Sequence, residues 1–477
     1  MKKAHSGLSY DGQQASSSGK RAFAEEGFRG EAFPLLTDPV TKRDAPLFVE
    51  NLRRGAKARS EWMCGIEFEL FGYDARRNFA RLSPTQVQRV LAGFAPSSND
   101  LVYENGVLVE VNAGQMNRLT VEPGGQVEFS GAPQRTLLDV EREVRRYLSR
   151  LKEIAEGNSF VFLAVGFDPL STLDEQRWFP KARYRVMRPY LKTRGERSWD
   201  MMTRTCAVQA NLDYGAGEDL SKKFLIGNRL APIATAIFAN SPFEEGRASG
   251  YKSTRTLAWL NTDRERTGCS PPALAEKFRP EDFVAYALEV PMLFAQRDGL
   301  YLDEPAGMKF GDFLEHGCEC IDPVFGDWAD HLTTIFTVAR LKQHIELRSA
   351  DCGSTEMALA VQALWKGLMY DEASLDEALR LAPRLKPDEM LELEETVARD
   401  GLATKACGVE VLALAKEMIR LSADGLRRFA PEELQHLDIL FQQVLDEELC
   451  PADILLLNWH GSWHGDIQRV IEYLRIA

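Results

Sequence analysis

The sequence predicts an α+β fold, in which mostly antiparallel strands form a sheet that helices cover on one side. Several segments alternate between polar and apolar residues, as half-buried strands do. Tight-turn residues separate two pairs of these segments, as they do in antiparallel hairpins. From about residue 355 onward the pattern is helical and rich in Leu, Glu and Ala. Regular alternation of strands with helices is absent, which argues against a Rossmann fold.

The first predicted strand covers residues 63–72. Glu67 and Glu69 lie on one of its faces and apolar residues lie on the other, so we expect this strand to be half-buried. The next two strands lie within residues 101–110, on either side of the dipeptide Asn105-Gly106. This dipeptide between β-forming residues is a strong signal for a two-residue hairpin turn.

A second strand pair is predicted at residues 118–122 and 126–130, on either side of a Pro-Gly-Gly turn. A helix is expected over residues 138–155, because its apolar residues recur at the spacing of an amphipathic helix. A buried strand follows at residues 159–166, and an irregular loop is expected after it, over residues 167–183.

The remaining elements follow from the same patterns: strands at 203–213, 251–260 and 341–349, and a helix at about 219–240. Gln209 and Asn211 share one face of the first of these strands. Glu346 and Arg348 share one face of the last strand.

The pattern divides the chain into three regions: an N-terminal arm and lead-in at 1–60, a catalytic α+β domain at 61–354, and a helical C-terminal subdomain at 355–477. The first 30 residues lack an apolar signal core, and we interpret them as a flexible arm. The acidic pair Glu25-Glu26 argues against a transit peptide in this arm.

The composition of the chain argues against several classes of protein. The chain has 477 residues, of which 44% are hydrophobic and 27% charged, as in a soluble globular protein. Its formal net charge of -13 argues against binding to a nucleic-acid backbone. No stretch reaches the about 18 consecutive apolar residues of a membrane helix. The eight scattered cysteines include no CxxC pair, which argues against a zinc ribbon. We therefore expect a cytoplasmic monomer or homodimer with reduced thiols.

Carboxylates on the polar faces of the predicted strands are the most informative feature of the sequence. They are Glu67, Glu69, Glu122, Glu128 and Glu346. Two-residue spacing places neighbours on one side of a sheet, and converging carboxylates repel unless a cation lies between them. Mg²⁺ is the natural cation, because it prefers oxygen ligands and is shared with substrate phosphates. The alternative is an ordinary solvated strand face, but three such segments, each apolar on the other face, favour the metal.

A nucleotide, if one binds, has to be held without a Walker loop. No G-x-x-x-x-G-K-[ST] motif exists, and Gly124-Gly125 is not followed by a lysine. Metal ions and arginines are then the groups that can neutralise phosphate charge.

Seven segments together resemble the plant-type glutamate–cysteine ligases and occur in the same order. They are GIEFELFG, LTVEPGGQVEFSGAP, KARYRVMRPY, DMMTRTCAVQANLDY, IATAIFANSPFEEG, KSTRTLAW with NTDRERTG after it, and HLTTIF with LKQHIELRSAD. The match runs from about residue 60 to the end of the chain. It implies a curved antiparallel sheet related to the catalytic core of glutamine synthetase.

The resemblance also implies a reaction and its ligands. Members of this family use ATP to phosphorylate the γ-carboxylate of glutamate, and the amine of cysteine then attacks the γ-glutamyl phosphate. This is the first step of glutathione synthesis. ATP, Mg²⁺, glutamate and cysteine are therefore the expected cofactors and substrates.

The roles of individual residues follow from the same resemblance, position by position. Glu67, Glu69, Glu122, Glu128 and Glu346 match the metal-binding glutamates, and Gln209 faces the same metals. Arg348 matches the arginine that contacts the ATP phosphates, and we expect it to be catalytic. Arg255 matches the arginine that pairs with the α-carboxylate of glutamate, which suits a planar guanidinium. The substrate pocket is completed by Asn211 and by a loop carrying Tyr184, Arg188 and Tyr190.

Other interpretations remain open. Arg348 could pair with Asp351 on the surface, and Arg255 could be a solvated strand arginine. Gln209 and Asn211 could be internal hydrogen-bonding groups. At the level of function, the acceptor could be another amine, or the protein could be a non-catalytic binder of nucleotide or glutamate.

A disulfide clip found in the plant members is not expected here. Cys320 falls where one partner of that clip would be, whereas the other partner would fall near Glu304-Pro305, where there is no cysteine. Cys318 and Cys320 are therefore expected to be free thiols.

Overall fold

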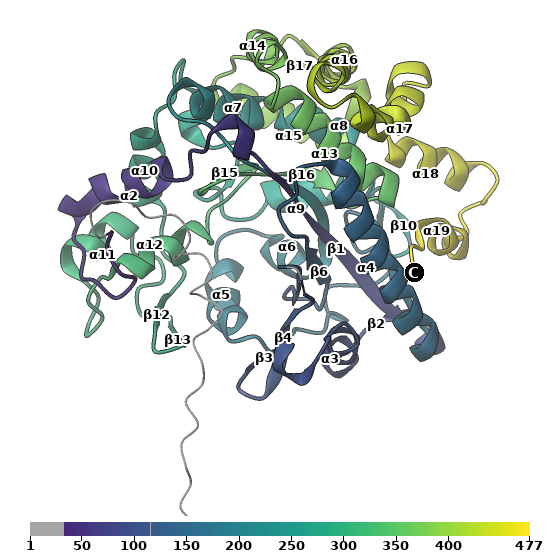
Figure 1. Ribbon diagram of the computed structural model, residues 1–477. Coiled ribbons are helices and arrows are strands. Elements are labelled where there is room, and N and C mark those ends of the chain that lie inside the picture. The colour runs from purple at the N-terminus through teal and green to yellow at the C-terminus, as the bar shows by residue number, and fades with distance from the viewer. Residues whose placement is uncertain (1–32, 115) are drawn as a thin grey trace, which may run out of the picture.

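The protein is described here by a computed structural model, which covers residues 33–114 and 116–477 (Figure 1). The flexible arm predicted for residues 1–30 lies outside the described residues. The lead-in that follows contains a folded helix, α2 (Ala45–Arg53). Phe48 of α2 is fully buried and stacks on Trp328, with 4.7 Å between the ring centroids. The lead-in is therefore part of the packed structure.

A ten-stranded sheet runs through the molecule, with the order β15-β16-β8-β1-β6-β5-β4-β3; β2 and β7 also pair with β1. Every pairing in this sheet is antiparallel. The strands are β1 (Cys64–Asp74), β2 (Ala80–Arg81), β3 (Leu101–Glu104), β4 (Val107–Asn112), β5 (Arg118–Val121), β6 (Val127–Ser130), β7 (Phe160–Leu163), β8 (Ala207–Leu212), β15 (Ala339–Leu341) and β16 (Ile345–Asp351). The α+β prediction is confirmed.

Helices α4 (Leu137–Asn158), α8 (Ala231–Ile237) and α13 (Thr355–Met369) pack on the apolar face of this sheet. The strands present buried apolar residues to them, such as Phe68 of β1 and Phe129 of β6. Tyr147 of α4 stacks on Phe129 with 4.6 Å between ring centroids, a contact of about 0.5–1.5 kcal/mol beyond simple burial. Burial of this face leaves the polar face available for chemistry.

The other helices surround this core on two sides (Figure 1). Helices α10 (Pro280–Glu289), α11 (Phe310–His316) and α12 (Phe325–Leu332) lie near α2 on the left of the view. The C-terminal part is helical, as the sequence predicted, and lies at the upper right. It continues from α13 through α14 (Glu372–Leu381), α15 (Pro387–Asp400), α16 (Val411–Phe429), α17 (Asp438–Leu440), α18 (Pro451–His460) and α19 (Ile467–Leu474).

Two predictions of local structure are wrong. Residues 251–260 were expected to form a strand but contain helix α9 (Thr254–Leu260), which begins where the Ser253 side chain accepts a hydrogen bond from the Thr256 backbone N–H. The expected loop that carries Tyr184 is helix α5 (Ala182–Lys192), which contains Pro189. Apolar residues at helical spacing bury one side of α5 and outweigh the cost of the proline.

Two more predicted elements are divided differently. The strand expected at residues 203–213 begins later, because residues 203 and 204 end helix α6 (Ser198–Arg204). The helix expected at residues 219–240 is two helices, α7 (Glu218–Arg229) and α8. Pro232 lies in the first turn of α8, where a helix tolerates proline.

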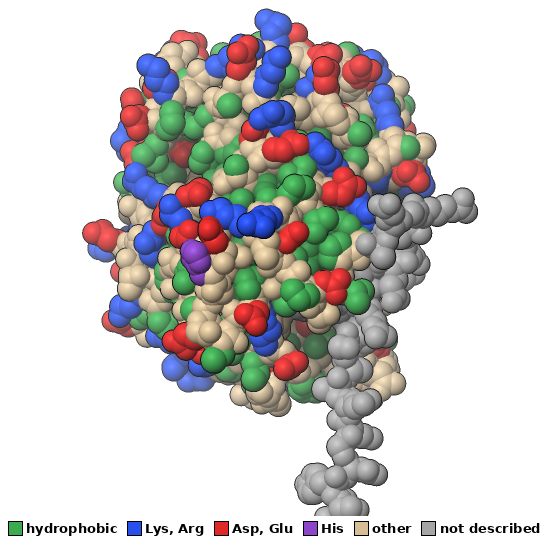
Figure 2. Space-filling view, turned by 90° about the vertical axis from the view of Figure 1, so that its left-hand side faces the viewer, with side chains coloured by type: hydrophobic (Ala, Val, Ile, Leu, Met, Phe, Trp, Pro, Cys, Tyr) green, Lys and Arg blue, Asp and Glu red, His purple; other side chains and the backbone are tan. Residues whose placement is uncertain are grey.

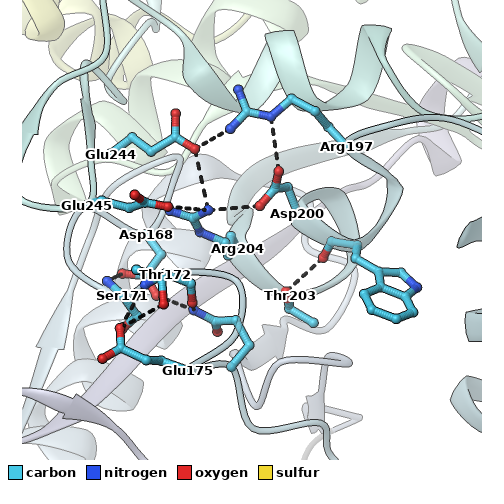
Figure 3. Close-up of polar contacts among 12 residues, drawn as sticks. Asp168, Ser171, Thr172, Glu175, Arg197, Asp200, Thr203, Arg204, Glu244 and Glu245 are labelled. Carbon is cyan, nitrogen blue, oxygen red and sulfur yellow. Dashed lines mark hydrogen bonds and ion pairs between the residues drawn. The ribbon is translucent and has the colours of Figure 1, made fainter.

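Ion pairs hold α6 in place and so fix the start of β8 (Figure 3). Arg204 at the end of α6 donates from Nη1 to Asp200 Oδ1 at 2.9 Å and to Glu244 Oε1 at 3.4 Å. Arg197, before the helix, donates to Asp200 Oδ2 at 3.0 Å and also pairs with Glu244. Arg204 is almost fully buried, so this network belongs to the packed interior just before β8.

The surface shows charges of both signs interspersed, as Figure 2 displays for one face. No helix in the described part of the chain is both long enough and apolar enough to span a bilayer. All eight cysteines are free thiols, including Cys318 and Cys320.

Candidate active site

The polar face of the sheet brings the predicted carboxylates together through its register. Glu69 of β1 lies directly opposite Glu128 of β6, and Glu67 lies opposite Gln209 of β8. Asn211 of β8 lies opposite Glu346 of β16. Directly opposed residues in antiparallel strands point to the same face, so residues from four strands converge here.

Amide side chains of β8 bind the carboxylates of β1. Gln209 donates from Nε2 to Glu69 Oε1 at 3.1 Å, and Asn211 donates from Nδ2 to Glu67 Oε1 at 3.0 Å. The backbone N–H of Ala207 donates to the other oxygen of Glu69 at 2.7 Å. Gln209 and Asn211 are therefore hydrogen-bonding groups, as one interpretation of the sequence held, and their partners are the carboxylates themselves.

The carboxyls of Glu67, Glu69 and Glu128 are driven toward their protonated forms. Burial, followed by the charges of Glu346 and Glu128, raises the pKa of Glu67 to about 7. Burial and the charges of Glu122 and Glu128 raise the pKa of Glu69 well above its usual range, and burial and Glu122 raise that of Glu128. Clustered carboxylates with raised pKa values are a typical property of a functional site.

Glu346 is held in the opposite state by three cations. Burial opposes its ionisation, but Arg340, Lys342 and Arg348 hold the pKa of its carboxyl well below the usual range. Arg340 makes a bidentate contact, in which Nη2 donates to Oε1 at 2.6 Å and Nε donates to Oε2 at 3.2 Å, and Lys342 lies 2.7 Å from Oε2. These cations place strong positive charge beside the carboxyls whose pKa values are raised.

Arg348 joins the two groups of carboxylates. Its Nη1 donates both to Glu346 and to Gln209 Oε1, and Gln209 in turn binds Glu69. The surface pair with Asp351 that the sequence left open does not form. Asp351 is buried and accepts hydrogen bonds from the hydroxyls of Ser241 and Ser253, at 2.6 and 2.9 Å.

Arg255 reaches the same region from helix α9 and is buried, so the alternative of a solvated strand arginine is wrong. Its Nη2 donates to the backbone carbonyl of Arg348 at 2.7 Å, and Nη1 lies 3.8 Å from Asp351 Oδ1. Its charge also lowers the pKa of Glu69, although burial and the neighbouring carboxylates raise that pKa overall. Arg255 therefore lies close to both Arg348 and the carboxylates.

The three predicted pocket residues on α5 have different positions. The Tyr184 hydroxyl donates to the Val121 carbonyl at 2.6 Å, one residue before Glu122. Arg188 lies between two indoles, with its guanidinium 4.1 Å from the ring centroid of Trp178 and 4.7 Å from that of Trp199. Tyr190 has a buried hydroxyl without a hydrogen-bond partner among the described residues, and the guanidiniums of Arg194 and Arg266 lie 5.6 and 5.7 Å from its ring centroid. Of the three, Tyr184 is the one placed beside a predicted carboxylate.

Sequence reasoning missed two cations of the site, Arg340 and Lys342. Arg340 lies opposite Glu346 in the register of β15 with β16. The sequence does contain a signal for these two cations. Every second residue from 340 to 348 is polar or charged, as expected for one face of a strand. The predicted strand began at residue 341 and so excluded the first of them.

The donor set suits Mg²⁺ chemically, although its side chains are bound to one another. Within residues 33–114 and 116–477, no three His, Cys, Asp or Glu side chains are already gathered closely enough to hold a metal ion. The groups present are carboxylate and amide oxygens, which hard cations prefer. Asn211 Oδ1 is buried there without a hydrogen-bond partner, and the raised pKa values of Glu67 and Glu69 indicate carboxyls short of positive charge.

Comparison with known proteins gives the family. The model of glutamate–cysteine ligase family 2 matches residues 63–473. The chain belongs to this family. Its relatives include the chloroplastic glutamate–cysteine ligases of Medicago truncatula, 36% identical over 92% of this chain and 86% of that protein, and of Arabidopsis thaliana, 37% identical over 92% and 84%. The resemblance seen in the sequence is confirmed.

A solved structure supports the fold. The glutamate–cysteine ligase from Francisella tularensis, solved in complex with AMP, superposes with a TM-score of 0.53. The superposition covers 86% of this chain and 88% of that one at 14% identity. At this identity the likeness shows a shared fold.

The relatives correct one prediction. We expected a cytoplasmic protein, but the plant relatives of this family member are named as chloroplastic enzymes, which contradicts that expectation. The expectation depended on the composition of the first 30 residues and on the pattern of cysteines. Neither feature carries enough information to assign a compartment.

Proposed function

We propose that this protein ligates the γ-carboxylate of glutamate to the amine of cysteine with ATP, through a γ-glutamyl phosphate. The observation that carries the proposal is the carboxylate face beside Arg348, in a chain of glutamate–cysteine ligase family 2. Carboxylates next to strongly held arginines suit a reaction that moves a phosphoryl group without a protein nucleophile.

Magnesium is part of this proposal. The side chains that would hold it are those of Glu67, Glu69, Glu122, Glu128 and Glu346, with Gln209 on the same face of the sheet. Bound there, Mg²⁺ would neutralise the charge of the ATP phosphates. The hydrogen bonds that Gln209 and Asn211 donate to Glu69 and Glu67 keep these carboxylates oriented on one face.

Arg348 and Arg255 have separate roles in the proposed reaction. An oxygen of the glutamate γ-carboxylate attacks the γ-phosphorus of ATP, and ADP leaves. The neutral amine of cysteine then attacks the acyl carbon, phosphate leaves with the carboxylate oxygen that bridged carbon and phosphorus, and the amine loses one proton as the amide forms. Arg348, which Glu346 and Gln209 orient, stabilises the charge on the transferring phosphoryl group. Arg255 positions glutamate by its α-carboxylate.

Purified protein incubated with ATP, Mg²⁺, glutamate and cysteine is expected to release ADP and to form γ-glutamylcysteine, detected by mass. Arg348→Ala should lower turnover by about 10²-fold or more, because the phosphoryl charge loses its partner. Release of ADP at an unchanged rate in this variant would remove Arg348 from the mechanism. Absence of ADP release with any amine would favour the non-catalytic alternative.

The same assay tests the acceptor. A panel of amines, each at the same concentration, is supplied in place of cysteine, and the products are identified by mass. We expect cysteine to be preferred by a wide margin. Comparable turnover with another amine would instead identify a γ-glutamyl ligase of different specificity.

A further inference from the structure

Lys342 lies in the hairpin loop between β15 and β16, and its ammonium group contacts the carboxylate face. Its Nζ lies 2.7 Å from Glu346 Oε2. Burial raises the pKa of Glu67 and the charge of Lys342 opposes that rise, so the ammonium group also acts on a carboxyl of β1. Lys342 is therefore a cation close to two of the carboxylates that are proposed to bind Mg²⁺.

The three cations around Glu346 are held to different degrees. Arg340 also donates from Nη1 to two backbone carbonyls, at 3.1 and 3.3 Å. Arg348 also donates to a side-chain amide of β8. The ammonium group of Lys342, by contrast, has no hydrogen-bond or ion-pair partner other than Glu346 within residues 33–114 and 116–477. Lys342 is therefore the cation that fewest contacts hold in place.

The backbone of Lys342 is fixed, whereas its side chain is free to turn. The backbone carbonyl accepts from the Tyr214 hydroxyl at 2.8 Å, and the backbone N–H donates to the His344 carbonyl at 2.9 Å. The side chain is 28% exposed, compared with 9% and 13% for the two arginines on Glu346. A lysine carries its charge on a flexible four-carbon stem. The ammonium group can therefore leave Glu346 while the hairpin stays in place.

A divalent metal ion and Lys342 would compete for the same carboxylate. Both bind carboxylate oxygens, and two cations on one oxygen repel each other strongly where little water screens them. Glu346 is fully buried and already contacts two arginines. Metal binding at Glu346 would therefore displace the most weakly held of its cations, which is Lys342.

We propose that Lys342 exchanges partners when the substrates bind: it yields Glu346 to the metal ion and then binds a phosphate oxygen of ATP. The inference rests on the proposed ligase function and adds a phosphate-binding residue that sequence reasoning did not select. An ammonium group displaced from Glu346 stays beside the metal that holds the ATP phosphates, and lysine is a common partner of phosphate. The exchange would make metal binding and nucleotide binding depend on each other.

Titration with Mn²⁺ in the absence of nucleotide, followed by electron paramagnetic resonance, measures the first half of the exchange. Lys342→Met removes the competing cation and keeps an unbranched apolar side chain. This variant should bind Mn²⁺ about tenfold more tightly than the unaltered protein, because the metal no longer displaces a charge. A lysine that only supports the fold would leave the affinity for Mn²⁺ unchanged or lower.

Calorimetric titration with the β,γ-imido analogue of ATP, at saturating Mn²⁺, measures the second half. Lys342→Met should bind this analogue about tenfold or more weakly, because a phosphate oxygen loses a charge-assisted hydrogen bond. The two affinities therefore change in opposite directions, which a general loss of structure would not produce. Lys342→Arg keeps the charge, so both of its changes should be smaller than those of Lys342→Met.

Lys222→Met is the matched control. The Lys222 side chain is 25% exposed and forms an ion pair with Asp376 at 2.6 Å, so it resembles Lys342 in exposure and pairing. Its partner belongs to helix α14 rather than to the carboxylate face. The affinities of Lys222→Met for Mn²⁺ and for the analogue should equal those of the unaltered protein.

The outcomes separate this inference from the proposed function. The exchange is overturned, and the ligase function stands, if the unaltered protein binds both ligands but Lys342→Met binds Mn²⁺ no more tightly or the analogue no more weakly. If the unaltered protein binds neither ligand, the proposed function fails and the inference fails with it. Should Lys342→Met not fold, the neutral variant Lys342→Gln replaces it, with the same expected and contradicting results.

Discussion

Identical side chains acquire opposite properties at this site, because their neighbours differ. Glu67 and Glu346 both lie on the polar face of the sheet, and burial opposes the charge of each. Glu67 is surrounded by other carboxyls, and its pKa rises to about 7. Glu346 is surrounded by three cations, and its pKa falls. Neighbours in space, rather than the residue type, decide which carboxylate is stably charged.

The sequence could place the carboxylates on one face, because strand periodicity determines the side from which a residue emerges. It could not identify Arg340. This residue lies opposite Glu346 across the hairpin of β15 and β16, so its role depends on how the two strands pair. Such a partner depends on how elements pack, which no local pattern records.

Glu394 is buried on helix α15 and should make the stability of the protein depend on pH. The pKa of its carboxyl is about 7 in the folded protein and 4.5 in an unperturbed glutamate, so the folded state binds the proton more tightly. The stabilisation, about 3 kcal/mol, is complete below pH about 4.5 and is lost as the pH rises through about 7. Glutamine at this position does not titrate, so Glu394→Gln lacks this dependence.

Thermal unfolding of both proteins between pH 5 and pH 8 tests this expectation. The melting temperature of the unaltered protein should fall relative to that of Glu394→Gln as the pH rises. Parallel curves for the two proteins would mean that the carboxyl of Glu394 is not perturbed by burial.

At the scale of elements, turns with specific backbone requirements were the easiest to predict. Asn105-Gly106 joins β3 to β4, and both residues have positive φ angles of 49° and 79°. The Pro-Gly-Gly turn joins β5 to β6 as expected. Helix α9 was mistaken for a strand, because its short sequence contains both β-forming and helix-forming residues. Its packing against α6 and α15 favours the helix, and only tertiary packing provides that information.

The Pro-Gly-Gly turn lies between Glu122 and Glu128 and is in close contact with helix α6. A Cβ atom on Gly124 would lie 2.3 Å from the carbonyl oxygen of Thr203, which is closer than any real contact. Gly124→Ala should therefore displace the turn and lower stability by about 1–3 kcal/mol, and it should reduce turnover because Glu122 and Glu128 flank the turn.

Gly157 provides the matched control. A Cβ atom on Gly157, in helix α4, would meet nothing within 4 Å. Gly157→Ala should raise stability by roughly 0.5–1 kcal/mol, because alanine favours the helix. Denaturant unfolding compares the two variants. Equal stability of Gly124→Ala and the unaltered protein would show that the turn can move without cost.

At the scale of the whole molecule, a buried ion pair joins two C-terminal segments to each other and to the start of helix α4. Lys366 of α13 contacts both oxygens of Glu433 at 2.8 and 2.7 Å, and both side chains are at least 96% buried. Glu433 also accepts from the Leu137 backbone N–H at the start of α4. The pair therefore links three segments that the sequence keeps far apart.

Breaking this pair should destabilise the protein strongly. Lys366→Met leaves Glu433 buried without its cation and is expected to cost about 3–5 kcal/mol. The exposed pair Lys405–Glu410 is the control, and Lys405→Met should change stability by less than about 1 kcal/mol. Denaturant unfolding measures both variants. A loss in Lys366→Met no larger than that in Lys405→Met would show that the link is not structural.

The overall architecture was predictable because strand alternation, hairpin turns and a helical tail all indicate the same fold. The division of the chain at residues 60 and 354 remains a prediction, as does the oligomeric state. The cellular compartment was predicted wrongly, because neither the packing of side chains nor the periodicity of the sequence determines where a protein is located.

We propose above all that the carboxylate face binds a divalent metal together with ATP. Titration with Mn²⁺ in the presence of a non-hydrolysable ATP analogue, followed by electron paramagnetic resonance, measures this binding directly. Glu69→Gln should weaken Mn²⁺ binding by about tenfold or more, because a carboxylate ligand is lost. Glu110→Gln, which changes a carboxylate in the same cross-strand row but two strands beyond Glu128, should bind as the unaltered protein does. Equal Mn²⁺ affinity in Glu69→Gln and the unaltered protein would contradict the account.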